Sequence, residues 1–333
     1  MQIGNLNIDG ILFLAPLAGV SNHPFRILAR RYGADFCYTE MISADAIVRN
    51  QKKTLNMVDI SPDEHPIGLQ LFGSSPEIIA RAVACGPELG ADLIDLNLGC
   101  PVKKVVRRNG GAALLKDLSL TSEIMAAAVE NAALPVTIKM RTGWDTEDEA
   151  FLEVSKMAEK CGVSAVTLHA RSRSAGFSGK SDWSKIAQLK REISIPVIGN
   201  GDINSPHDAK AIISQTGCDA IMIGRAAMKN PHILRQIKDF ITLDRTIPDL
   251  TIKQKVELAL EHSCLMIEKY GEKVGTLKMR KHLAWYSHGF PDGASLRRQL
   301  NQISGYSDIC NLFSEFQNAR GADIEDAFNP ESQ

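Results

Sequence analysis

The 333-residue sequence lacks several features that would point to a membrane, secreted or metal-binding protein. It has no apolar run near the roughly 20 residues that a membrane-spanning helix needs. Its first residues lack the basic and then apolar segments of a signal peptide, so we expect a cytoplasmic protein without a membrane partner. The seven cysteines form no C-x-x-C pair and are odd in number, so we expect neither a disulfide framework nor a metal site. The net charge of −1 is not that of a strongly basic nucleic-acid-binding domain, which leaves only a local basic face open.

Short apolar runs typical of strands alternate with helical segments along the first 243 residues. Eight such runs occur, at residues 11–17, 36–41, 67–72, 93–98, 136–140, 165–169, 195–199 and 220–224. Helix-start residues such as Ser75-Pro76-Glu77 and helix-ending glycines such as Gly162 lie between them. Eight strand–helix units predict a (β/α)8 TIM barrel. A doubly wound open sheet is the alternative, but no G-x-G-x-x-G motif follows the first run.

A second domain is predicted after the barrel, which we expect to cover residues 1–243. Residues 244–249 include a proline and are interpreted as a linker. Helical patterns then occur at 252–270, 278–287, 296–303 and 307–316, which predicts an all-α domain over residues 250–320. The polar, acidic residues 321–333 are expected to form a flexible tail. The sequence does not determine the oligomeric state, and a monomer is our expectation.

Polar residues gather where the predicted strands end, and in a barrel these ends converge on one face. The set comprises Glu40, Gln70, Asn97, Cys100, Lys139, Arg141, His169, Arg171, Asn200, Asp202 and Arg225. Lys139 ends an apolar strand, where an ammonium needs a polar or anionic partner. Gly201 and Gly224 follow the last two strands, where barrels often bind a phosphate, and Arg225 adds a fixed charge. This pattern favours flavin mononucleotide (FMN) across the barrel mouth, with Lys139 at the N1–C2 edge of its ring and Gln70 at its pyrimidine edge.

Cys100 leaves the fourth run within Asn97-Leu98-Gly99-Cys100-Pro101, where it could be a nucleophile, a general acid or a core residue. From the residues alone, three functions compete. One is an FMN-dependent reductase of a free pyrimidine, of the dihydroorotate dehydrogenase kind, although a small substrate needs no basic helical domain. The second is a Schiff-base aldolase that uses Lys139, which leaves Cys100 unexplained. The third is a non-enzymatic RNA-binding barrel, against which the intact set of rim residues argues.

Seven motifs follow one another along the chain: Ala15-Pro16-Leu17-Ala18-Gly19, Gln70-Leu71-Phe72-Gly73, Asn97-Leu98-Gly99-Cys100-Pro101, Lys139-Met140-Arg141-Thr142-Gly143-Trp144, His169-Ala170-Arg171, Gly199-Asn200-Gly201-Asp202 and Gly224-Arg225. In this order they resemble the tRNA-dihydrouridine synthases, specifically the bacterial B-type branch. The resemblance continues into the helical region, at Met279-Arg280-Lys281-His282 and Trp285-Tyr286. Leu17 stands where many relatives have methionine, a substitution of similar volume.

The resemblance implies reduction of the uracil C5=C6 bond in tRNA by a bound FMN, which NADPH reduces first. It implies that Cys100 is the proton donor. The FMN contacts that it implies are Pro16, Leu17, Ala18, Gln70, Lys139, Asn200, Gly201, Asp202, Gly224 and Arg225, and we assign His169 to the flavin site by its position. A free thiol with a pKa of about 8.5 is mostly protonated at neutral pH, as a proton donor must be.

A tRNA substrate requires a basic surface, since the target base must be turned out of the folded RNA. Basic residues follow the cysteine motif and the sixth strand, and others lie beside aromatic residues in the helical region, a pattern that suits backbone and stacking contacts with RNA. The alternative is a solvated helix whose aromatic residues lie in a core. The substrate contacts that we predict from position are Asn97, Lys103, Arg141, Arg171, Arg280, Lys281, Arg297 and Arg298.

Overall fold

The structure is a computed structural model that describes residues 1–318, so the predicted tail at 321–333 lies outside the described residues. The chain divides into two compact units. The first comprises Met1–Ala227 and Ile233–Thr246, and the second comprises Met228–His232 and the residues from Ile247 onward. The boundary predicted at residues 243–250 lies beside one of these junctions. The grouping of residues 228–232 with the helical unit was not expected from the sequence.

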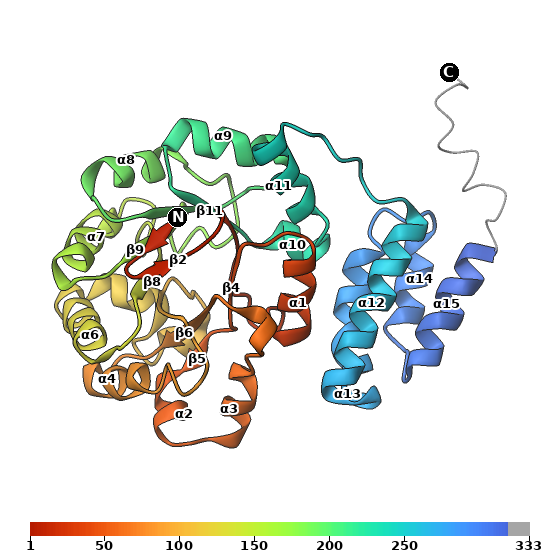
Figure 1. The fold of residues 1–333 in the computed structure, drawn as a ribbon, viewed down its shortest axis with the longest axis horizontal. Helices are drawn as coiled ribbons and strands as arrows, with labels where there is room; N and C mark the ends of the chain where they lie inside the picture. Colours follow the sequence, from red (N-terminus) through yellow and green to blue (C-terminus); the bar gives the residue numbers. More distant parts are fainter. Residues whose placement is uncertain (319–333) are drawn as a thin grey trace. The chain divides into compact units, whose positions relative to one another are not determined.

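Eight parallel strands form a closed barrel in the first unit (Figure 1). They are β3 (Leu12–Leu14), β4 (Phe36–Tyr38), β6 (Ile67–Phe72), β7 (Leu93–Leu98), β8 (Val136–Arg141), β9 (Ala165–His169), β10 (Val197–Asn200) and β11 (Ala220–Ile223). The barrel closes because β4 pairs with β6 as well as with β3, and β11 pairs with β3. Each strand overlaps one of the predicted runs, and the predicted TIM barrel is confirmed.

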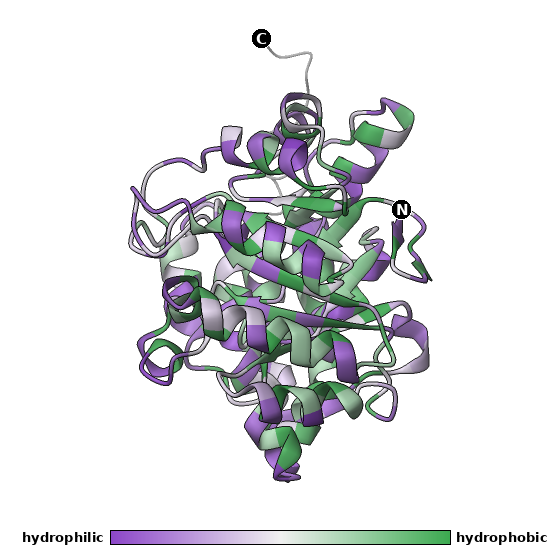
Figure 2. Cartoon of the chain, turned by 90° about the vertical axis from the view of Figure 1, so that its left-hand side faces the viewer, coloured by the Kyte–Doolittle hydropathy of each residue, from purple (hydrophilic) through white to green (hydrophobic). Residues whose placement is uncertain are grey.

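Helices connect the strands and cover the outside of the barrel (Figure 1). They are α1 (His23–Arg31), α2 (Ala44–Val48), α3 (Lys52–Val58), α4 (Pro76–Ala84), α5 (Lys103–Val106), α6 (Leu118–Asn131), α7 (Ala150–Cys161), α8 (Ser184–Glu192), α9 (Pro206–Thr216), α10 (Arg225–Lys229) and α11 (Ile233–Leu243), with the 3-10 turns η1 (Pro62–Glu64) and η2 (Gly111–Lys116). Their ends follow from the sequence: the Ser75 hydroxyl caps α4 by accepting from the Ile78 N–H, and Gly162 ends α7 with φ +88°. Hydrophilic and hydrophobic residues alternate in bands along these helices (Figure 2), as expected for helices with one buried face.

Three very short strands were not predicted, because two residues are too few to produce a periodic pattern. β5 (Ile42–Ser43) pairs with the end of β6. β1 (Gln2–Ile3) and β2 (Leu6–Asn7) form an antiparallel pair. Ile3 and Ile8 are fully buried in a cluster with residues from the starts of the barrel strands, such as Phe13 and Leu93. The N-terminal hairpin therefore closes the end of the barrel at which the strands begin.

The inward-facing residues change from apolar to polar along the strands. On β7, Leu93 lies in the core cluster, Asp95 follows two residues later and Asn97 reaches a cavity at the other end. On β9, Ala165 belongs to the same cluster, whereas His169 lines the cavity. Because side chains two residues apart share a face of a strand, this order gives the barrel one apolar end and one polar end.

The second unit contains α12 (Ile252–Tyr270), α13 (Glu272–Tyr286), α14 (Gly293–Leu300) and α15 (Tyr306–Asn318). Met266, Met279, Leu283 and Phe313 are buried within it. Within residues 1–318, no helix has both the length and the apolar character that crossing a membrane requires.

Candidate active site

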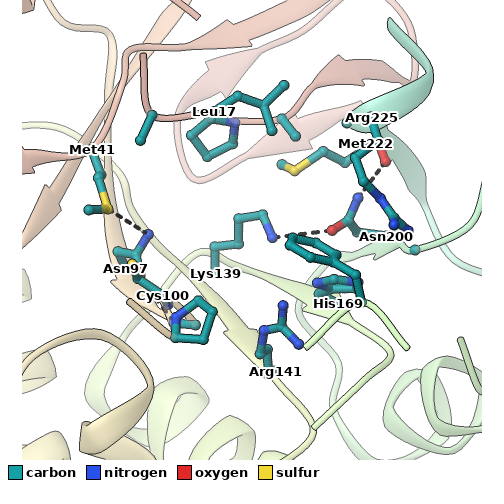
Figure 3. A pocket seen from close by; sticks show the side chains of 18 of the residues that line it. Leu17, Met41, Asn97, Cys100, Lys139, Arg141, His169, Asn200, Met222 and Arg225 are labelled. Atoms are coloured by element: carbon teal, nitrogen blue, oxygen red, sulfur yellow. Dashed lines mark hydrogen bonds between the residues drawn. The ribbon is translucent and has the colours of Figure 1, made fainter. Parts of the chain in front are cut away.

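A cavity of about 280 Å³ opens where the barrel strands end. Its walls come from the ends of all eight strands and from the loops that follow them, and Figure 3 shows these side chains converging. The structure brings together Cys100, Asn97 and Arg141 with all eleven residues predicted to hold the cofactor: Pro16, Leu17, Ala18, Gln70, Lys139, His169, Asn200, Gly201, Asp202, Gly224 and Arg225. Lys103 and Arg171 do not line the cavity.

Lys139 rises from the middle of this cavity (Figure 3). Its Nζ donates a hydrogen bond to Asn200 Oδ1 over 3.2 Å, and the Asn200 amide in turn donates to the Met222 carbonyl over 2.7 Å. No carboxylate in residues 1–318 lies within ion-pair distance of this ammonium. Burial lowers the pKa of Lys139 to about 8, although Asp95 acts in the opposite direction. Lys139 is therefore a positive group that is ready to receive negative charge.

Asp202 and two arginines form a charged cluster beside Lys139. Asp202 accepts hydrogen bonds from Arg171 Nη2 over 2.6 Å and from Arg225 Nη2 over 2.9 Å. Partial burial alone would raise the pKa of Asp202, but Arg171 and the Ser181 N–H lower it below its ordinary value. The carboxylate fixes the Arg225 guanidinium at the cavity wall, where that cation can meet an anion.

Gly201 allows this cluster to form. Its φ is +125°, which disfavours any residue with a side chain. A Cβ there would lie 2.2 Å from Ser181 Oγ and 3.1 Å from His169 Cδ2. Gly201, which directly follows β10, is therefore required for close packing against the loop after β9.

That loop, residues 172–182, is held by two buried arginines. Arg171 uses all five of its N–H groups, on the Ser178 and Gly179 carbonyls, the Ser181 hydroxyl and both oxygens of Asp202. Arg141 donates to two further carbonyls of the loop, those of Ser172 and Gly176. In this conformation Arg171 has no donor left for a tRNA phosphate, and both arginines position the loop.

Cys100 lies at the other side of the cavity, beside Asn97 (Figure 3). The Asn97 side-chain oxygen accepts from the backbone N–H groups of Gly99 and Cys100, over 3.1 and 2.9 Å. The Cys100 carbonyl accepts from the Ala112 N–H over 3.1 Å. Gly111, with φ +60°, makes this approach possible, since a Cβ there would lie 2.8 Å from the Cys100 oxygen. The thiol is therefore presented by a backbone that is fixed on both sides.

The cavity environment keeps the thiol protonated and the neighbouring imidazole neutral. Burial raises the pKa of Cys100, and the Val102 N–H and Arg141 only partly offset this effect. Burial, together with Lys139 and Arg141, lowers the pKa of His169 to about 2. At neutral pH Cys100 can therefore donate a proton, and His169 can only form hydrogen bonds as an uncharged ring.

The basic residues predicted to contact tRNA differ in their exposure. Lys103, Lys104, Arg107 and Arg108 are exposed on and just after α5, close in sequence to Cys100. In the helical unit, Arg298 is exposed, whereas Arg280 donates to the Ile303 carbonyl and Arg297 to the Ser287 carbonyl. Tyr286 is a core residue, with its hydroxyl 2.9 Å from His262 Nδ1, and Trp285 is half-buried.

Met41, Met222 and Phe177 are among the cavity residues that sequence reasoning missed. Met222 could have been found, because it lies two residues before Gly224 and so faces the same side of the strand. Phe177 lies on the long loop after β9, where no periodicity exists. Its ring is 58% exposed and lies 4.6 Å from the Arg225 guanidinium. No group of three or more side chains in residues 1–318 could hold a metal ion.

Comparisons with known sequences give a consistent result. A family model described as "Dihydrouridine synthase (Dus)" matches residues 13–320. The tRNA-dihydrouridine synthase B of Pseudomonas aeruginosa is 38% identical over 323 residues, which cover 96% of this chain and 97% of that protein. The tRNA-dihydrouridine synthase B of Vibrio cholerae is 38% identical over 303 residues, with 91% and 94% covered. A protein of Rickettsia bellii named a probable tRNA-dihydrouridine synthase is 37% identical, with 95% and 97% covered.

Two solved structures with a similar fold are far more distant in sequence than these relatives. Histamine dehydrogenase from Rhizobium sp. 4-9 aligns with a TM-score of 0.58 and 14% identity, over 80% of this chain and 50% of that one. The old yellow enzyme homologue from Zymomonas mobilis aligns with a TM-score of 0.52 and 14% identity, over 76% and 94% of the two chains. At this identity the likeness concerns the barrel fold alone.

Proposed function

The chain belongs to the dihydrouridine synthase family, and from this premise we propose that it reduces the C5=C6 bond of a uridine in tRNA to 5,6-dihydrouridine. FMN is the proposed bound cofactor and NADPH the proposed reductant. The observation that carries the proposal is that one cavity contains a protonated thiol, Cys100, and an ammonium, Lys139, for which residues 1–318 provide no ion-pair partner. We place this reaction in the cytoplasm and assign it to a monomer.

The residues of the cavity fit a flavin. Lys139 is a desolvated cation, and no carboxylate of the described residues lies at ion-pair distance from it. A flavin ring carries negative charge when it is reduced, and such a cation can stabilise that charge. Arg225 offers its guanidinium to a phosphate at the neighbouring wall. Leu17, Met41 and Met222 supply apolar surface for the ring. When bound and reduced, the flavin supplies the hydride that the uracil receives at C6.

Cys100 then supplies the proton at C5. Its raised pKa keeps the proton on sulfur until a basic carbon is formed in front of it. The nearby Arg141 charge favours the thiolate that remains, because a cation lowers the pKa of a thiol. Transfer of a proton from solvent returns the thiol to its starting state.

The substrate base must leave the tRNA stack to reach this cavity. The exposed side chains Lys103, Lys104, Arg107 and Arg108 follow Cys100 directly and are proposed to contact the RNA backbone. Arg280, Lys281, Arg297 and Arg298 are the corresponding proposed contacts in the helical unit. Arg298 is exposed, whereas the Arg280 and Arg297 guanidinium groups each donate to a backbone carbonyl.

The test uses purified protein with NADPH and tRNA that lacks dihydrouridine. We expect a yellow protein whose NADPH oxidation depends on this tRNA and produces dihydrouridine, measured by mass spectrometry. Turnover with free uridine or orotate, and none with tRNA, would instead identify a small-substrate reductase. A colourless protein that cannot be reconstituted with FMN would contradict the flavin assignment.

Cys100→Ala separates the two half-reactions. We expect reduction of the bound flavin by NADPH to persist, while reduction of uracil falls by about 10²–10⁴-fold because the general acid is missing. Stopped-flow absorbance of the flavin and quantification of dihydrouridine measure the two steps. Cys161→Ala, a half-buried cysteine on α7, is the control and should change neither rate. Equal loss of both half-reactions in Cys100→Ala would rule out the proton-donor role.

A further inference from the structure

Asp95 is a buried acidic residue in the middle of the barrel that the proposed reaction does not use. It lies on β7 and is 1% exposed. One carboxylate oxygen accepts from the Thr137 hydroxyl over 2.7 Å, and the other accepts from Gln70 Nε2 over 2.8 Å. Burial raises the pKa of Asp95 to about 6, and Gln70, Thr137 and the Lys139 charge limit the rise. At neutral pH the group is therefore mainly an ionised acceptor.

The hydrogen bonds continue from Gln70 to the backbone of Cys100. Gln70 Oε1 accepts from Asn97 Nδ2 over 2.8 Å. Asn97 Oδ1 then accepts from the N–H groups of Gly99 and Cys100. Gln70 is 1% exposed, and its amide nitrogen and amide oxygen each have a partner in this chain. A continuous chain thus joins a buried carboxylate to the backbone that carries the thiol.

The direction of every bond in this chain is fixed from its two ends. An ionised carboxylate can only accept, so Gln70 must present its NH₂ group to Asp95 and its oxygen to Asn97. A backbone N–H can only donate, so Asn97 must present its oxygen to Cys100 and its NH₂ group to Gln70. Both ends therefore require the same orientation of the two amides. If the acceptor at position 95 were lost, the orientation of Gln70 would no longer be determined from that side.

We propose that Asp95 is a positioning residue for the Cys100 thiol, which it holds in place through the side chains of Gln70 and Asn97. The contacts stand on the structure alone, whereas their consequence for uracil reduction rests on the proposed function. Hydrogen bonds that all point the same way along a buried chain reinforce one another, and a single reversed amide leaves two like groups facing each other. Asp95 fixes the direction of the chain at its buried end, although its carboxylate does not line the cavity.

An exchange of the two polar groups tests the direction of the chain. Gln70→Glu places a second carboxylate against Asp95, which disrupts the chain wherever both groups are ionised. Adding Asp95→Asn restores every bond, because the asparagine NH₂ group introduced at position 95 donates to the new carboxylate at position 70. The second oxygen of that carboxylate still accepts from Asn97. The measurement is hydrogen–deuterium exchange of the Gly99 and Cys100 amides by mass spectrometry. A peptide over residues 97–101 reports these two groups, because its first two residues lose their label and Pro101 has no amide.

We expect Gln70→Glu to accelerate exchange of these amides at least about fivefold, as for the loss of a buried hydrogen bond. The double variant should return to within about twofold of the parent. Thr137→Val, which removes the bond to the far oxygen of Asp95, is the matched buried control and should leave these amides protected. If Gln70→Glu does not fold, Gln70→Leu replaces it in the first comparison and should show the same acceleration.

Unchanged exchange in the single variant, or no recovery in the double variant, would overturn the proposal. The single variant is then assayed for kcat of uracil reduction at saturating FMN, which should fall. The double variant is compared by exchange alone, because it keeps a carboxylate at position 70, a predicted flavin contact. An error in the proposed function would remove this kinetic signal but would leave the exchange pattern intact. An error in the positioning role would leave exchange unchanged while tRNA reduction still occurs.

Discussion

The two ends of the barrel are made from the same eight strands and have opposite chemistry. At the end where the strands begin, Ile3, Phe13 and Phe36 pack in a closed apolar cluster. At the end where they finish, Lys139 and Arg225 line an open cavity. One end gains free energy by removing apolar surface from water, whereas the other keeps charged groups partly desolvated, which costs free energy.

The difference shows that the residues that stabilise the barrel and the residues that can bind a ligand lie at opposite ends of its axis. At the closed end, a substitution that removes side-chain volume lowers the free energy of unfolding, because close-packed apolar groups lose contacts with every atom removed. The open end contains the groups that a ligand would neutralise. Substitutions at the closed end should therefore change the free energy of unfolding, and substitutions at the open end should change binding and rate.

A pair of phenylalanines gives the largest expected contrast. Phe13 is completely buried 5.2 Å from the ring of Phe36, whereas Phe177 is 58% exposed at the open end. We expect Phe13→Ala to lower the free energy of unfolding by about 3–5 kcal/mol, since it leaves a cavity in the closed end. Phe177→Ala should cost less than about 1 kcal/mol. Urea unfolding measures both, and similar losses would remove the distinction between the ends.

Gly201→Ala should have the next largest effect. The new Cβ meets Ser181 Oγ in a backbone conformation with φ +125°, so we expect a loss of about 1–3 kcal/mol in stability together with weaker flavin binding. Gly217→Ala is the control: φ there is +66°, and nothing lies within 4 Å of the added Cβ. It should cost only about 1 kcal/mol and leave flavin affinity unchanged. Equal flavin affinity in the two variants would show that the Gly201 contact is not needed for the site.

Lys139→Met should raise stability while it lowers affinity for the flavin. A pKa lowered to about 8 means that below this pH the folded protein holds a charged lysine whose burial lowers the free energy of unfolding. Parent stability should therefore increase as pH rises from about 8 towards the unfolded pKa of about 10.4, and the variant should lack this increase. Without flavin, we expect Lys139→Met to gain about 1–3 kcal/mol at pH 7.

The flavin-binding arm uses fluorescence titration of FMN into the apoprotein. We expect affinity to fall by about tenfold or more, because a charged hydrogen bond is lost. A Lys139→Met variant that is less stable than the parent and binds FMN with unchanged affinity would contradict the role of Lys139 as a cation that binds the flavin.

Substitution of two exposed lysines compares tRNA binding at the two ends of the barrel and should give the smallest effect of these predictions. Lys103 follows the strand end that carries Cys100, whereas Lys160 lies in the last turn of α7, towards the start of β9. If Lys103 contacts a phosphate, Lys103→Ala should reduce the slope of log K against log salt concentration by about 1. Lys160→Ala should leave that slope unchanged. Filter binding at several salt concentrations measures it, and equal slopes would place the RNA elsewhere.

The strands and the members of the cavity could largely be predicted from the sequence. Apolar runs such as 93–98 are local, and the residue at the end of each run reaches the same face in any parallel barrel. The role of Arg171 could not be predicted, because its partners at positions 178–181 and 202 depend on how a loop without periodicity folds back. Asp95 was overlooked inside an apolar run, although its spacing of two residues from Asn97 places both on one face.

The sequence by itself determined which residues stand at the strand ends, because strand formation depends on side chains within a few positions of each other. Only the tertiary structure decided which of them are partners. Gln70 and Asp95 are 25 residues apart and Arg171 and Asp202 are 31 apart, and the register of the closed barrel brings each pair within hydrogen-bond distance. Tertiary structure likewise decides the pKa of Lys139, which burial lowers and Asp95 on the neighbouring strand raises, whereas the bond from the Cys100 N–H to Asn97 is local.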